Sequence, residues 1–91
     1  MSDGELIAEL MNRQVVLDVS SPFVYAGTLV GEDDRYFVLE EADVHDLRDT
    51  TTTRELYVVE IKRHGISSNR RRVLVRRDEV VSLAALDDVL V

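Results

Sequence analysis

Several short stretches are rich in β-branched and other apolar residues, in places with a period of two, which is the pattern of β-strands. The first stretch is Val15–Val19, and the second, Phe23–Val30, is interrupted by Gly27. A glycine inside a strand often marks a bend or a bulge. The small and acidic residues 31–34 then predict a turn. A third strand starts at Tyr36 and becomes polar as far as Asp43.

Two more strands are predicted in the last quarter of the chain. Arg72, Leu74 and Arg76 alternate with Val73 and Val75, and Val80–Leu83 follows after a short break at Asp78 and Glu79.

An amphipathic helix is predicted before the first strand. Ser2 or Asp3 supplies its N-cap, and the helix ends around Asn12. Its apolar side chains recur at spacings that place them on one face. They are Leu6, Ile7, Leu10 and Met11.

The segment Thr50–Ile66 has strand propensity at its centre but helix signals at both ends. Residues 52–55 (TTRE) match a capping box, in which a threonine caps one amide and Glu55 reaches back to another. Basic residues precede Gly65, which suits the left-handed position after a helix, and Ile66 would then contact Ile61. We therefore predict a helix of about three turns here.

The chain of 91 residues is expected to form a single domain over residues 1–91. Five short strands with tight connections predict a small, strongly bent barrel, because closure removes the edges of so small a sheet. Cysteine is absent, which suits a reducing cytoplasm. No stretch approaches the roughly 18 apolar residues of a membrane span, so no membrane partner is expected.

Charge is distributed unevenly along the chain. Seven of the eleven basic residues lie between Lys62 and Arg77 with no carboxylate among them, although the net charge is −7. A local basic surface can attract an anion that the whole molecule repels. Arg70, Arg71 and Arg72 can contact an RNA backbone, or they can pair with the chain's own carboxylates across a subunit interface, and the sequence leaves both open.

Two segments resemble the signatures of the Sm/LSm family. In the first, residues 27–36 (GTLVGEDDRY), Gly27, Leu29 and Asp33 match the glycine, the leucine and the aspartate that precede a hydrophobic residue and an asparagine. The second, Val73–Val81, resembles an apolar residue, arginine and glycine followed by another apolar strand. The resemblance covers most of the chain except roughly residues 43–69. It implies a mainly β fold: an N-terminal helix, then a five-stranded, strongly bent Sm-like (SH3-like) barrel with a helical insertion between strands 3 and 4.

The resemblance also implies an RNA site. In the family, the asparagine and the arginine bind a uracil edge, and the residue before the asparagine stacks on the base. By resemblance, Tyr36 stacks on the base and Arg76 keeps the role of the family's arginine. Asp33 also belongs to the RNA site. Phe37 stands where the family has asparagine and cannot supply that hydrogen bond, while Arg77 stands where it has glycine. We therefore expect RNA binding with an altered base preference.

Tyr36 and Phe37 are adjacent on a strand, so their side chains point to opposite faces. One of them is expected in the core, and the other faces either a site or a neighbouring subunit.

Sm-like proteins form rings in which the fourth strand of one subunit pairs with the fifth strand of the next. The resemblance therefore implies a homo-oligomer of about five to seven copies. Its predicted interface consists of Arg72, Val73, Leu74, Val75, Val80, Val81 and Leu83.

Enzymatic chemistry has little support in the sequence. It contains no nucleophile elbow, no phosphate-binding glycine loop and no paired-histidine motif. Glu41, Asp43 and His45 alternate along a strand at a spacing that could suit a divalent metal, but such trios are common on solvated strands. We expect no catalysis, no metal and no cofactor.

Two functions remain as hypotheses. The first is a homo-oligomeric Sm-like ring that binds RNA, favoured by the concentration of arginine. The second is a ring-forming scaffold or protein-interaction module that does not bind uridine-rich RNA, favoured by Phe37 and the acidic balance.

Overall fold

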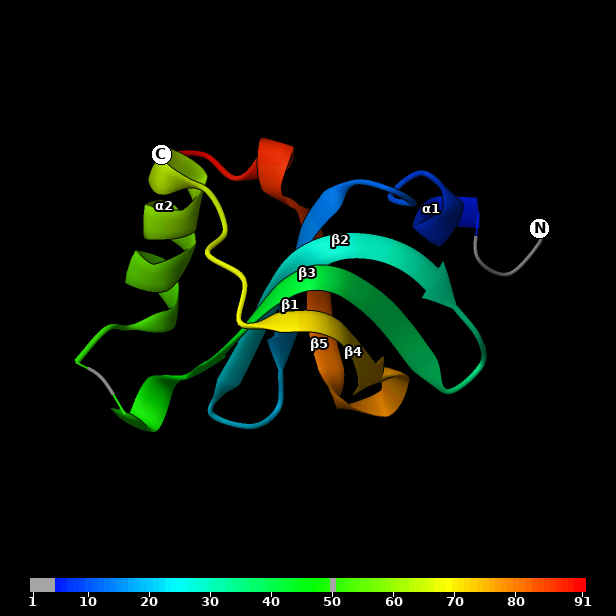
Figure 1. The fold of residues 1–91 in the computed structure, drawn as a ribbon, viewed down its shortest axis with the longest axis horizontal. Coiled ribbons are helices and arrows are strands. Elements are labelled where there is room, and N and C mark those ends of the chain that lie inside the picture. Colours follow the sequence, from blue (N-terminus) through cyan, green and yellow to red (C-terminus); the bar gives the residue numbers. More distant parts are fainter. Residues whose placement is uncertain (1–4, 50) are drawn as a thin grey trace.

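A computed structural model describes residues 5–49 and 51–91 (Figure 1). The elements in chain order are α1 (Glu5–Ala8), β1 (Gln14–Val19), β2 (Phe23–Glu32), β3 (Tyr36–Asp46), η1 (Leu47–Asp49), α2 (Arg54–His64), β4 (Arg70–Arg76), η2 (Arg77–Glu79), β5 (Val80–Ala85) and η3 (Leu86–Asp88). Every predicted strand is confirmed, and most of them extend beyond their predicted ends. Within the described residues, no helix is long and apolar enough to cross a bilayer.

The strands form one antiparallel sheet in the order β4-β3-β2-β1-β5. Figure 1 shows how strongly the sheet curves, with β4 and β5 carried toward one another. They do not pair, so the predicted mainly β fold is confirmed but its closure is not. The sheet is bent rather than closed, and β4 and β5 remain as its two edges.

The bend depends on irregular pairing between β2 and β3. Their register shifts between Ala26 and Thr28 and again between Leu29 and Gly31. Opposite the first shift, Glu41 adopts a positive φ of 46°. The irregularity predicted at Gly27 is therefore confirmed, but the extra residue lies on β3, where Glu41 and Ala42 together oppose Gly27. Such a bulge bends and twists the strand that carries it.

Apolar side chains pack on both faces of β1. Leu17 faces the interior of the bent sheet, whose core also contains Leu29, Leu39, Phe37 and Val75 among others. Val16 faces the other way and packs with residues of β2, α2 and η3. Burial on both faces explains why the start of β1 is a continuous apolar run rather than an alternating one.

The two helices cover these two cores. α1 is shorter than predicted, yet Ile7, Leu10 and Met11 pack against the interior core, while Leu6 is 73% exposed. The predicted capping residues Ser2 and Asp3 lie outside the described residues. In Figure 1, α2 lies on the side of the sheet away from α1. Its buried Tyr57 and Ile61 belong to the second core.

The insertion between β3 and β4 is helical, as predicted. Its N-cap is Thr53, whose hydroxyl accepts a bond from the Leu56 amide at 3.1 Å. The cap thus lies one residue later than the predicted box, which places Glu55 too early to bond back to the cap. Gly65 has a φ of 87°, and its amide donates to Ile61 at 2.8 Å. Ile66 packs against the core that contains Ile61, so the predicted end of the helix at Gly65 is confirmed. The ψ of Gly65 is 168°, so this glycine has a positive φ but not the predicted left-handed conformation.

Candidate nucleic-acid interface

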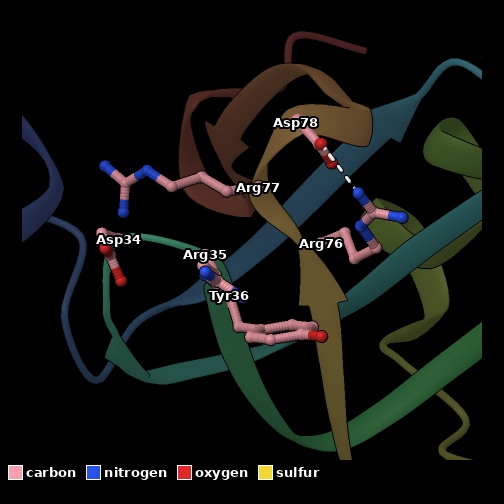
Figure 2. Close-up of a pocket in the computed structure, with 6 residues that line it drawn as sticks. All are labelled: Asp34, Arg35, Tyr36, Arg76, Arg77 and Asp78. Atoms are coloured by element: carbon pink, nitrogen blue, oxygen red, sulfur yellow. Dashed lines mark hydrogen bonds and ion pairs between the residues drawn. The ribbon is translucent and has the colours of Figure 1, made fainter.

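Tyr36 and Arg76 are direct partners in the pairing of β3 with β4, so both side chains leave the sheet on the same face. They line a cavity of about 420 Å³ at the end of β4 (Figure 2). In the view of Figure 2, the Arg76 guanidinium turns toward Asp78, and the Tyr36 ring lies lower in the picture. The remaining lining residues come from the loop before β3 and from η2, and they are Asp34, Arg35, Arg77 and Asp78.

The loop before β3 is organised by Asp33. Its carboxylate accepts hydrogen bonds from the amides of Arg35, at 2.8 Å, and Tyr36, at 2.7 Å. These backbone bonds hold the pKa of the Asp33 carboxyl below its usual value, with smaller contributions from the charges of Arg35 and Arg77. Asp33 therefore shapes the site through the backbone, and it does not line the cavity itself.

Phe37 and Arg77 form a contact beneath the cavity. Phe37 is 4% exposed and belongs to the interior core, as expected for one of the two adjacent aromatic residues. The Arg77 guanidinium lies 4.7 Å from the centroid of its ring. Arg77 also pairs with Glu32 and donates to the carbonyl of Asp33 at 2.8 Å. Of the two aromatic residues, only Tyr36 faces the cavity.

The charges around the cavity are mixed. Arg76 pairs with Asp78 at 2.9 Å, and Arg77 pairs with Glu32. Arg35 is exposed, and no ion pair joins it to another described residue. The sequence analysis missed Asp34, Arg35 and Asp78, although each lies next to a predicted site residue and could have been found from that proximity.

The arginine cluster lies elsewhere. Arg70, Arg71 and Arg72 are exposed at the start of β4, whereas Arg76 is at its end. Six residues of strand separate Arg70 from Arg76, a distance of about 20 Å at roughly 3.3 Å per residue. The structure therefore divides the basic segment into two sites, one at the cavity and one at the far end of the edge strand.

The residues predicted at the subunit interface also divide into two groups. Arg72, Leu74 and Val81 are exposed, with Leu74 at 51% and Val81 at 73%. Val73, Val75, Val80 and Leu83 instead pack against or within the interior core. These four can contribute to strand pairing through their backbone only.

The three candidate metal ligands do not gather. The bulge at Glu41 breaks the alternation that would have aligned it with Asp43 and His45. Asp43 accepts bonds from the Tyr57 hydroxyl at 2.6 Å and the Asn69 amide at 3.0 Å, and His45 stacks on Tyr57. Among the described residues, no group of three His, Asp or Glu side chains could hold a metal ion. Asp43 and His45 instead fix α2 to the sheet through Tyr57.

Comparison with known proteins supports the architecture. No protein-family model matches the chain, and no curated protein matches it in sequence. Among solved structures, it is similar to an Sm protein of Pyrococcus abyssii in complex with a uridine heptamer. The two are 16% identical, with a TM-score of 0.63, and the match covers 93% of this chain and 99% of that one. With the strand order, the bent sheet and the N-terminal helix, this similarity establishes that the chain has the Sm fold.

Proposed function

We propose that this protein self-associates through its sheet edges and binds single-stranded RNA at the cavity of Tyr36 and Arg76, without a preference for uridine. The observation that carries the proposal is the pairing of Tyr36 with Arg76 on one face beside an open cavity. An aromatic ring next to a guanidinium is a common arrangement for binding a stacked base and its phosphate. The solved Sm protein with the same fold was bound to a uridine heptamer, which supports RNA as the ligand class.

The altered base preference follows from the surroundings of Phe37. A buried aromatic ring covered by Arg77 offers no amide to a base edge. What remains is stacking on Tyr36, a contact worth roughly 1–3 kcal/mol per base and tolerant of base identity. Arg76 and Arg35 add donors that suit phosphate oxygens.

Self-association is supported by the two unpaired edges, β4 and β5, which expose Leu74 and Val81. Unpaired strand edges with apolar side chains are usually covered in stable proteins. Head-to-tail pairing of the edges would cover both and would generate a ring of about five to seven copies if the rotation closes. No catalytic step is part of this proposal.

A second candidate, a ring-forming scaffold that binds no RNA, is favoured by one observation. Asp34 and Asp78 line the cavity, and Asp78 already pairs with Arg76. Together with the net charge of −7, these carboxylates oppose an incoming phosphate.

The two candidates are separated by light scattering combined with fluorescence anisotropy. The probes are oligo(U) and oligo(A) of about ten nucleotides, within the usual range of site sizes. We expect an oligomer that binds both probes with similar affinity, more weakly at high salt, and that loses binding in Tyr36→Ala and Arg76→Ala. An oligomer that ignores both probes at low salt would favour the scaffold. Binding that survives both substitutions would refute the site.

A further inference from the structure

The two edges of the sheet carry opposite charges at corresponding ends. β4 begins with Arg70, Arg71 and Arg72, all exposed, and β5 leads into η3, where Asp87 and Asp88 are exposed. The side chain of Asp87 is 88% exposed and forms a long ion pair with Arg13 of the same subunit, at 3.9 Å. Within one subunit these two groups lie on opposite edges of an open sheet.

The three arginines are not neutralised within the subunit. Arg70 donates to the carbonyl of its neighbour Asn69. Glu40 is the cross-strand partner of Arg72, yet no ion pair joins them, and no ion pair joins Arg71 to another described residue. A charge of +3 thus remains on the edge strand, about 13–20 Å from Arg76 along β4.

The acidic group is held firmly in place. The Lys62 ammonium of α2 donates to the carbonyls of Leu86, at 3.1 Å, and Asp87, at 3.3 Å. Leu86 is buried in the second core. The backbone of η3 is therefore anchored while the carboxylates of Asp87 and Asp88 point into solvent.

Chain direction then decides which charges meet. β4 ends and β5 begins at η2, so the start of β4 and the end of β5 are both far from that turn. If β4 of one copy pairs antiparallel with β5 of another, the start of β4 lies beside the end of β5. With seven residues in β4 and six in β5, the strands match in length. With the start of β4 opposite the end of β5, Arg70 would face Ala85, and its long side chain could reach toward Asp87 and Asp88 of the second copy, just beyond that end.

We propose that this complementary pair of charge clusters is a docking surface for a second copy of the chain, and that it fixes the direction and register of edge pairing. The inference rests on the proposed self-association and assigns the arginine cluster to the subunit interface rather than to RNA. Opposite charges across an interface select orientation and register, because like charges brought together are strongly unfavourable. The arginines also prevent β4 from pairing with another β4.

Charge exchange within one chain tests the proposal without depending on subunit number. The acidic-edge variant carries Arg70→Glu, Arg71→Glu and Arg72→Glu, and the basic-tail variant carries Asp87→Lys and Asp88→Lys. The exchanged variant carries all five substitutions. Arg63→Glu, at an exposed position on α2 without an ion-pair partner among the described residues, is the matched control. Circular dichroism verifies the fold of each variant, and light scattering and sedimentation at micromolar concentration measure assembly.

We expect the acidic-edge and basic-tail variants each to weaken assembly by at least about tenfold, and the exchanged variant to recover it. Arg63→Glu should assemble like the wild type. The proposal is overturned if either half variant assembles normally, or if the folded exchanged variant stays as dissociated as its halves. An acidic-edge variant that assembles but no longer binds RNA would assign the arginines to RNA instead.

Two further measurements keep the outcome decisive. If a half variant fails to fold, the wild type is compared at about 0.1 M and about 1 M salt, where the Debye length falls from about 10 Å to about 3 Å. Assembly that weakens with salt supports the charge pair, and assembly that strengthens contradicts it, because general repulsion at a net charge of −7 would then dominate. A wild type that is monomeric in every condition refutes the proposed self-association itself, a result distinct from failure of the charge pair alone.

Discussion

The guanidinium of Arg77 lies over the ring of Phe37, 4.7 Å from its centroid. These are the two positions at which the chain departs from the Sm signatures it resembles. The two residues contact each other, so they act together as one packing unit. The ring fills the interior core, the guanidinium covers it, and Glu32 holds the guanidinium from the end of β2. The chemistry of the cavity is thereby changed without loss of packing.

A double-mutant cycle measures this contact. Phe37→Leu and Arg77→Gln should each destabilise the fold, and their combined effect should be smaller than the sum by about 0.5–2 kcal/mol, the range for a cation over an aromatic face. Urea unfolding followed by circular dichroism provides the free energies. Phe37→Leu combined with Arg63→Gln is the control pair and should be additive. Additivity within error for Phe37 and Arg77 would mean that the contact contributes nothing to stability.

The sequence predicts the strands and α2 because their signals are local. Runs of β-branched and other apolar residues mark the strands, and Gly65 and the threonines before Arg54 mark the ends of α2. The contacts that define the cavity are not local. Arg77 reaches Glu32 across 45 positions, and this depends on the direction in which η2 leaves β4. The sequence also could not predict that the sheet stays open, because pairing between β4 and β5 depends on the curvature of the whole sheet and on no single residue.

Gly27 lies where the bent β2 passes close to β3. A Cβ at this position would lie 3.0 Å from both Cα and Cβ of Ala42 and 3.1 Å from the carbonyl oxygen of Glu40. These atoms belong to a buried strand and cannot move aside easily. Gly27→Ala should therefore destabilise the protein by about 1–3 kcal/mol, the usual range for overpacking. Thermal unfolding measures the effect.

Gly31→Ala is the matched control for this substitution. Its Cβ would find Val38 at 3.7 Å, an ordinary contact distance, so we expect little change in melting temperature. Equal destabilisation by both substitutions would contradict the close approach at Gly27 and point instead to a general intolerance of β2.

Tyr57 fastens α2 to the sheet by donating its hydroxyl to Asp43 at 2.6 Å. Burial and the neighbouring carboxylate raise the pKa of the Tyr57 phenol well above its ordinary value of 10.0. Below pH 10 the phenol is protonated in both the folded and the unfolded chain. As the pH rises above 10, the unfolded chain ionises while the folded one keeps its proton, so stability falls.

Tyr57→Phe removes this ionisation and the hydrogen bond together. At neutral pH the variant should be less stable by about 1–3 kcal/mol, because the bond is to a charged acceptor. Above pH 10 its stability should fall less steeply than that of the wild type. Chemical unfolding at a series of alkaline pH values measures both effects, and parallel pH profiles would contradict the role of Tyr57.

Asp33 organises the loop that carries Arg35 and Tyr36 into the cavity. Two backbone hydrogen bonds lower the pKa of its carboxyl from 3.8. The bonds therefore persist at pH 3.8 and are lost only as the pH falls through the lowered pKa. In an acid titration by NMR, the amide shifts of Arg35 and Tyr36 should change together with a midpoint below 3.8. Asp33→Ala should abolish this titration and speed hydrogen exchange at both amides, whereas Asp34→Ala should not. Unchanged exchange in Asp33→Ala would show that the loop needs no such support.

Asp78 pairs with Arg76 at 2.9 Å and therefore competes with any phosphate for the same guanidinium. Asp78→Asn removes the competing charge but keeps the size of the side chain. If Arg76 binds RNA, the variant should bind oligo(U) and oligo(A) more tightly, by up to about tenfold, because one more cation is free. The slope of log affinity against log salt concentration should also steepen by about 0.7, the value for one added contact to a single strand.

Glu79→Gln is the control, since Glu79 accepts a bond from Ser20 at 2.5 Å and lies outside the cavity. Tighter binding in both variants would indicate a general effect of net charge. No change in Asp78→Asn would mean that Arg76 does not contact phosphate, and the proposed site would then rest on Tyr36 and Arg35 alone.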